Sequence, residues 1–159
     1  MTRPETAAPD RPGVIAPPPV IALAAILIGV GLHQLWPAGL LDGTARWAVA
    51  AVLCIGALAL AGASLIQFRR HKTHVDPYRP ATTLLRSGPY RFTRNPIYVA
   101  LVLLQAGIAV AADSAWILAM TVPALAVLHG GVVLREERYL AAKFGADYAA
   151  YRARVRRWL

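Results

Sequence analysis

The sequence predicts a small all-α membrane protein with about four transmembrane helices and a C-terminal amphipathic helix. Of its 159 residues, 57% are hydrophobic, and the mean hydropathy is +0.48. Charged residues make up 16%, against about 25% in typical soluble proteins. The formal net charge is nevertheless +9. High apolarity and high basicity coexist only if the charges are separated from the apolar stretches, as they are in a protein that crosses a membrane.

Four apolar stretches are long enough to be considered as spans. A helix rises about 1.5 Å per residue, so roughly 20 residues cross a bilayer core of about 30 Å. A polar, proline-rich tail at 1–17 is expected to be disordered, and 18–159 to form a single membrane domain. A cleaved signal peptide is disfavoured for the first stretch, because no small-residue cleavage site follows it. The spans are expected at about 18–36, 44–68, 97–112 and 114–134.

The third and fourth spans are expected to form a tight antiparallel hairpin, because Asp113 and Ser114 leave room for only a very short turn. Pro123 is expected to kink the fourth span. Gly130 and Gly131 allow a neighbouring segment to approach closely near the far end of that span, with simple helix packing as the alternative explanation.

The basic residues predict the orientation in the membrane. All of the 17 Lys and Arg residues except Arg46 fall in the tail, between spans two and three, or after span four. With four spans these regions share one face, which the positive-inside rule identifies as cytoplasmic. We therefore expect a multi-pass protein of the cytoplasmic (inner) membrane with both termini inside. Anionic lipid headgroups, rather than nucleic acid, are the expected partners of these charges.

Several classes of site are disfavoured. Cys54 is the single cysteine, so no intrachain disulfide can form. No glycine-rich phosphate-binding loop follows a strand-like run. The four histidines and Cys54 lack the spacing of metal ligands, and we expect no metal site.

Polar residues gather at 73–98 and 135–157, on either side of the predicted hairpin. Asn95 and Pro96 have the form of a helix start, with Asn as the N-cap. The hairpin would bring this group close to the Glu136-Glu137 pair. Adjacent carboxylates near lipid need cationic partners, so we expect Arg94 or a cationic ligand to pair with them. A solvated, salt-bridged helix end is the alternative without a functional role.

The second half of the chain resembles the isoprenylcysteine carboxyl methyltransferase and phospholipid methyltransferase superfamily in its short, bacterial form. The resemblance lies in the run Gly88-Pro89-Tyr90-Arg91-Phe92-Thr93-Arg94-Asn95-Pro96-Ile97-Tyr98, followed by an apolar hairpin and Glu136-Glu137. The signature of that superfamily is R-H-P-x-Y, a hydrophobic stretch and E-E. Thr73-x-Val75-x-Pro77 and the tail from Phe144 to Arg157 are also similar. Asn95 stands in place of the usual His and cannot titrate. Arg156 stands where many relatives have Pro.

The resemblance implies a methyltransferase that binds S-adenosylmethionine in a cytoplasmic pocket roofed by the C-terminal segment. Carboxylates would bind the hydroxyl or amino groups of the cofactor, Arg its carboxylate, and tyrosine faces its sulfonium. By this analogy the catalytic residues are Arg94, Glu136 and Glu137. The cofactor-binding residues are Gly88, Pro89, Tyr90, Asn95, Pro96, Tyr98, Glu136, Glu137, Tyr148, Tyr151 and Arg154.

The C-terminal stretch predicts an interfacial amphipathic helix that covers this site. Tyr148, Tyr151, Val155 and Trp158 recur at three- and four-residue spacing, with arginines at the other positions. Adhesion to anionic lipid is the alternative role of those arginines.

The function expected from these features is methyl transfer to a lipophilic acceptor. An isoprenylcysteine-like carboxylate needs no base, whereas the amine of a lipid headgroup does. The missing His favours an acceptor that is already nucleophilic. An NADPH-dependent sterol or enone reductase of related fold and a small non-enzymatic membrane scaffold are the alternatives.

Overall fold

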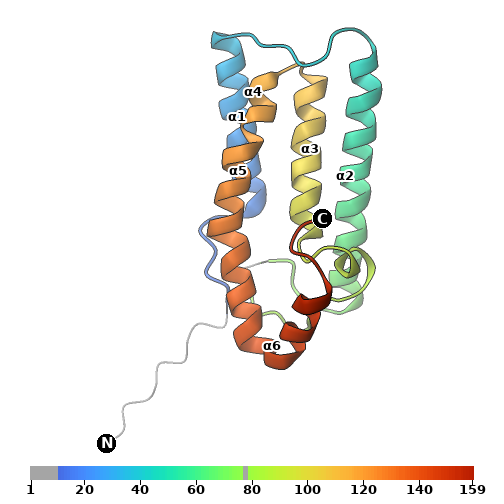
Figure 1. Cartoon of the computed structure of the whole chain (residues 1–159), viewed down its shortest axis with the longest axis vertical. Coiled ribbons are helices and arrows are strands. Elements are labelled where there is room, and N and C mark those ends of the chain that lie inside the picture. Colours follow the sequence, from blue (N-terminus) through green and yellow to red (C-terminus); the bar gives the residue numbers. More distant parts are fainter. Residues whose placement is uncertain (1–10, 77–78) are drawn as a thin grey trace, which may run out of the picture.

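The structure is a computed structural model that describes residues 11–76 and 79–159. Residues 1–10 of the predicted tail and Pro77 of the upstream motif lie outside the described residues. The described chain is helical and contains no strand, apart from an isolated bridge between Thr93 and Arg156. Figure 1 shows the long helices side by side, with α6 bent beneath them. The predicted all-α class is confirmed.

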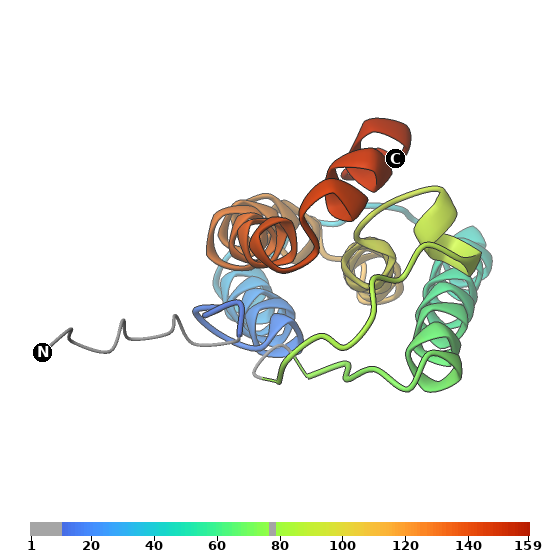
Figure 2. The ribbon, with the colours of Figure 1, turned by 90° about the horizontal axis from the view of Figure 1, so that it is seen from below.

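The apolar helices lie close to the predicted spans. Three helical stretches are long and apolar enough to cross a membrane: α1 (Pro18–Leu35), α2 (Ala45–Arg70) and the stretch Ala115–Arg154. A shorter apolar helix, α3 (Pro96–Ala111), stands between them. α2 packs along α3, and α1 packs against the first part of the fourth stretch, as Figures 1 and 2 show.

The fourth stretch is a chain of helical segments. Proline at position 123 has no N–H to donate to the carbonyl of Ala119, and the helix is interrupted at Met120. The predicted effect of Pro123 is therefore seen as this interruption. A π-helical turn follows at the two glycines. The segments are α4 (Ala115–Ala119), α5 (Thr121–Leu128), η2 (His129–Val133) and α6 (Leu134–Arg154).

The turn between α3 and α4 is as tight as predicted. Asp113 adopts a left-handed conformation with φ of 48°. Ser114 then caps α4, and its hydroxyl oxygen accepts a hydrogen bond from the N–H of Ile117 at 3.3 Å. These two residues reverse the chain and set α4 antiparallel to α3.

The same turn is fastened to the connection between α1 and α2. The Oδ1 atom of Asp113 accepts hydrogen bonds from the backbone N–H groups of Leu40 at 2.6 Å and Leu41 at 3.0 Å. Its Oδ2 atom lies 3.6 Å from the guanidinium of Arg46. These hydrogen bonds, with the Arg46 charge, hold the pKa of the Asp113 carboxyl below its usual value. We call this set of contacts the loop clamp.

The other end of the bundle is the α6 end, where α1 begins, α2 ends and α3 begins. α6 bends at Gly145 and ends at Arg154. Val155 is extended, so the predicted amphipathic helix stops short of Trp158. The reason is a competing interaction, because the backbone of the last residues pairs with the segment before α3. The Trp158 ring lies beside that of His129, with the ring centroids 6.2 Å apart.

Residues 11–17, which we call the N-terminal segment, correct the prediction of a disordered tail over this part of the chain. Val14 is buried in an apolar cluster with Tyr98, Leu128, Val132 and Val133. The N–H of Ile15 donates a hydrogen bond to the carbonyl of Gly131 at 3.2 Å. The proline-rich composition suggested disorder, but one buried valine and a backbone hydrogen bond hold the segment against η2.

Candidate functional site

A cavity of about 370 Å³ lies at the α6 end. This volume falls in the range of roughly 300–1,000 Å³ that is typical of small-molecule sites. Its wall is built from the N-terminal segment, the connection between α2 and α3, the start of α3, and α6. Nine of the predicted site residues line it: Tyr90, Arg94, Asn95, Pro96, Tyr98, Glu136, Glu137, Tyr148 and Tyr151.

Three predicted residues do not line the cavity. Gly88 and Pro89 begin η1 (Gly88–Arg91), a short 3₁₀ helix that leads to Tyr90. Gly88 has a φ of 59°, and a Cβ there would meet the side chain of Gln67, so glycine is needed to shape this approach. Arg154 is exposed and donates from Nε to the carbonyl of Ala150 at 3.2 Å.

Two buried tyrosines hold η1 against α6. The hydroxyl of Tyr151 donates a hydrogen bond of 2.7 Å to the carbonyl of Tyr90. The Tyr90 ring meets the ring of Phe68 edge-on, with the centroids 6.0 Å apart. Burial raises the pKa of both tyrosine hydroxyls above the usual range, so they remain neutral. Their role is to hold the two cavity walls together.

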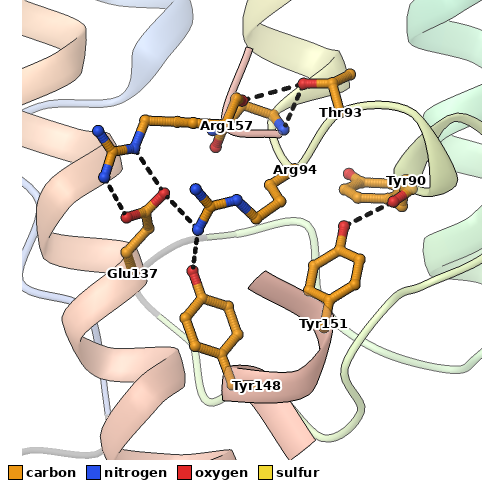
Figure 3. A network of polar contacts seen from close by, with 8 residues as sticks. Tyr90, Thr93, Arg94, Glu137, Tyr148, Tyr151 and Arg157 are labelled. Atoms are coloured by element: carbon orange, nitrogen blue, oxygen red, sulfur yellow. Dashed lines mark hydrogen bonds and ion pairs between the residues drawn. The ribbon is translucent and has the colours of Figure 1, made fainter. Parts of the chain in front are cut away.

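Glu137 is neutralised by two arginines. Its Oε1 lies 3.0 Å from Nη1 of Arg94, and the side-chain exposures are 12% for Glu137 and 9% for Arg94. Arg157 donates to both carboxylate oxygens, from Nε and Nη2, at 2.9 Å each. Arg94 also donates to the hydroxyl of Tyr148 at 3.3 Å, so its guanidinium lies between Glu137 and Tyr148 (Figure 3). The expected pairing of Arg94 with the glutamates is confirmed, with Glu137 as its partner.

Asn95 starts α3 as predicted, but its side chain does not cap the helix. Its Nδ2 instead donates a 2.8 Å hydrogen bond to the carbonyl of Arg157. The hydroxyl of Thr93 donates to the same carbonyl at 3.0 Å, and the N–H of Arg94 donates to the carbonyl of Arg156 at 2.9 Å. These bonds fix the C-terminal segment across the start of α3. The position needs a hydrogen-bond donor, which asparagine supplies without titrating.

Glu136 differs from its neighbour. The hydroxyl of Tyr98 lies 2.8 Å from each of its carboxylate oxygens, and this is its hydrogen-bond partner. Within residues 11–76 and 79–159 no Lys, Arg or His forms an ion pair with it. Burial raises the pKa of the Glu136 carboxyl to about 7. Glu136 is therefore a carboxylate in the cavity wall whose charge is not compensated by the described protein.

The polar atoms of the wall match a ligand that carries both a cation and an anion. Glu136 can accept a cationic group. Arg94 lines the cavity, so its guanidinium can donate to an anionic or carbonyl oxygen, and its buried Nε has no hydrogen-bond partner in the described part of the chain. S-Adenosylmethionine carries a sulfonium, an ammonium and a carboxylate, and the residues present fit those groups.

Sequence reasoning missed contacts in the wall and behind it. Arg157 stood in the recognised tail pattern, but its pairing with Glu137 depends on the path of the C-terminal segment. Tyr139 of α6 accepts a hydrogen bond from the N–H of Ala81 at 3.0 Å and so ties the connection before α3 to α6. Over residues 11–76 and 79–159, no three His, Cys, Asp or Glu side chains are grouped so that they could hold a metal ion.

Apolar helices long enough to span a membrane, with a cavity at one end of the bundle, define a helical membrane protein with a candidate small-molecule site. Residues 45–147 match the phospholipid methyltransferase family. This match covers more than half of the chain, from α2 through the Glu136-Glu137 pair and into α6. The chain belongs to the phospholipid methyltransferase family, as the resemblance predicted.

A relative among curated proteins is the cobalt-zinc-cadmium resistance protein CzcN of Cupriavidus metallidurans. It is 31% identical over 133 residues, which are 84% of this chain and 56% of that protein. The chain thus spans about half the length of this relative. No solved structure matches the chain significantly.

Proposed function

We propose that this protein is an S-adenosylmethionine-dependent methyltransferase that acts on a lipophilic acceptor at the cytoplasmic face of the inner membrane. The observation that carries the proposal is the uncompensated carboxylate of Glu136 beside the neutralised Arg94–Glu137–Arg157 network. Membership of the phospholipid methyltransferase family supports the reaction class. The orientation rests on the basic residues, nearly all of which belong to segments at the α6 end.

The residues have distinct roles in this proposal. The bound cofactor supplies an electrophilic methyl group on a positively charged sulfur. Glu136 would bind a positively charged group of the cofactor, and the hydroxyl of Tyr98 fixes the orientation of its carboxylate. Arg94 would bind the anionic end of the ligand, while Glu137 holds its guanidinium in place. Methyl transfer is an in-line displacement, so alignment of the two reactants is the main demand on the site.

Exclusion of water is the second demand on such a site. The connection before α3 is tied to α6 by the Ala81–Tyr139 hydrogen bond and by the ion pair between Arg86 and Asp147 at 3.0 Å. The C-terminal segment covers the start of α3. The connection lines the cavity directly, and the C-terminal segment holds the start of α3, which also lines it. An ionised Glu136 can also take the proton of an amine acceptor, whereas a carboxylate acceptor needs no base.

The decisive experiment is calorimetric titration of purified protein with S-adenosylmethionine, S-adenosylhomocysteine and NADPH. We expect the two adenosyl ligands to bind and NADPH not to bind. In Glu136→Gln we expect the affinity for S-adenosylmethionine to fall by roughly tenfold or more, because charge-assisted contacts contribute about 1.5–3 kcal/mol. The affinity for S-adenosylhomocysteine should fall less, because its sulfur carries no charge. Folded wild-type protein that binds neither adenosyl ligand would overturn the proposal, and NADPH binding would favour a reductase.

The pH dependence of cofactor affinity provides an independent check. With a pKa of about 7, Glu136 is protonated and neutral in mildly acidic solution and ionised above that pH. A cationic ligand favours the ionised form, so binding should strengthen as the pH rises through 7 and then level off. Near pH 7 about half a proton should be released per ligand bound. Titrations in buffers of different ionisation enthalpy measure this release, and Glu136→Gln should abolish it. If Glu136→Gln released as many protons on binding as the wild type, the released proton would come from another group.

A further inference from the structure

We propose that the N-terminal segment and the first turn of α1 form the binding wall for the apolar chain of the methyl acceptor, and that contact with Gly131 holds this wall in place. This inference rests on the proposed function and deepens it, since it assigns the acceptor side of the same cavity. The wall contains four prolines, Pro12, Pro17, Pro18 and Pro19, all of which line the cavity.

The chemistry of this wall suits an apolar ligand. Proline has no backbone N–H, so these residues present no donors to a polar group. The carbonyl of Pro17 already accepts a hydrogen bond from the N–H of Val20 at 2.9 Å. Ile97 and Leu140 line the same cavity and add further apolar surface. A lipid-like chain is the ligand that such a surface accommodates without leaving polar groups unpaired.

The wall is continuous with the proposed reaction site. Val14 packs in one buried cluster with Tyr98, whose hydroxyl binds Glu136. A chain lying on the prolines would therefore point its reactive end toward Glu136. This arrangement identifies the occupant as the acceptor, because the polar end of the cavity is accounted for by the cofactor. In Figure 2 the N-terminal segment lies beside α1 at the α6 end of the bundle.

Beside the buried Val14 and the Ile15–Gly131 hydrogen bond, two further contacts of the segment can be tested by substitution. A Cβ atom at position 131 would fall within 2.6 Å of Cγ1 of Ile15 and still closer to its Cδ1, so a side chain there would push the Ile15 side chain away from η2. Arg135 donates from Nη1 to the carbonyl of Gly13 at 2.8 Å. By contrast, a Cβ atom at position 130 would meet nothing within 4 Å. Gly130→Ala is thus a matched control for Gly131→Ala, in the same π-helical turn.

The experiment uses full-length protein in lipid nanodiscs and an alkylamine that carries a diazirine at its chain end. After irradiation, labelled peptides are mapped by mass spectrometry. In the wild type and in Gly130→Ala we expect labels on the N-terminal segment and the first turn of α1. In Gly131→Ala we expect the labelling of these residues to fall by roughly tenfold. This is the effect of weakening the seating of the segment by about 1.4 kcal/mol. Arg135→Gln, which leaves the helix packing intact, should reduce it in the same direction.

Binding of S-adenosylhomocysteine to the same samples separates the two proposals. Retained binding together with reduced labelling in Gly131→Ala and Arg135→Gln supports the wall. Retained binding with labels elsewhere, or with equal labelling in all variants, overturns the wall and leaves the methyltransferase proposal standing. Loss of binding in the folded wild type overturns the cofactor proposal, and specific labelling of the segment would then still report an apolar ligand site.

Discussion

Glu137→Gln is expected to lower the free energy of unfolding by about 3–5 kcal/mol, because it leaves two guanidinium groups facing a neutral amide at a largely buried position. Arg94 is the more affected of the two, since only 9% of its side chain is exposed. The thermal midpoint should fall by roughly 6–20 °C, and cofactor binding should be lost with it. A thermal melt of the purified variant, followed by calorimetry below its midpoint, measures both effects.

The chain provides a matched control for this experiment. Asp147 also pairs with an arginine, Arg86, at 3.0 Å, but 72% of its side chain is exposed. Exposed ion pairs contribute about 0–1 kcal/mol, so Asp147→Asn should melt close to the wild type. Glu136→Gln removes a carboxylate without breaking an ion pair and should also fold. If all three variants melted alike, Glu137 would not be the residue that holds the arginines in place.

Substitutions of Asn95 are expected to separate positioning from acid–base chemistry. Asn95→His can still donate an N–H to the carbonyl of Arg157, so cofactor affinity should remain within about threefold of the wild type, which is well under 1 kcal/mol. Asn95→Asp places an acceptor opposite that carbonyl. Leaving such a buried group unpaired costs about 1–3 kcal/mol, and affinity should fall by roughly tenfold or more.

The pH profile is the readout that a general base would change. If this position only fixes the C-terminal segment, the activity of Asn95→His should show no new ionisation between pH 5 and 8, the range in which a histidine titrates. A new pH-dependent step, or a large gain in rate, would mean that the position takes part in proton transfer. Limited proteolysis of Asn95→Asp tests whether the C-terminal segment is held less firmly than in the wild type.

Much of the fold follows from local rules that the sequence displays. The short turn at Asp113 predicts the hairpin because two apolar runs cannot be joined there in any other way. Asn95 and Pro96 predict the start of α3, since proline suits the first helical position. The pairing of Arg94 with the glutamates was predictable from the cost of leaving adjacent carboxylates unpaired near lipid.

The rest depended on contacts between distant segments. Glu136 and Glu137 are indistinguishable in sequence, and their opposite environments arise because one faces Tyr98 and the other two arginines. Several arginines in the tail were equivalent candidates, and only the turn away from helix after Arg154 brings Arg157 to Glu137. The packing of the N-terminal segment was not predicted, because proline-rich segments are commonly disordered. In the structure this segment packs against Gly131.

Because of the loop clamp, the two ends of the bundle respond differently to pH. Because backbone N–H groups, with the Arg46 charge, hold the pKa of Asp113 low, the clamp stays ionised in mildly acidic solution, where Glu136 takes up a proton. One end of the bundle is therefore held by a charge that persists in mild acid, whereas the cavity at the other end loses the charge of Glu136 over the same pH range.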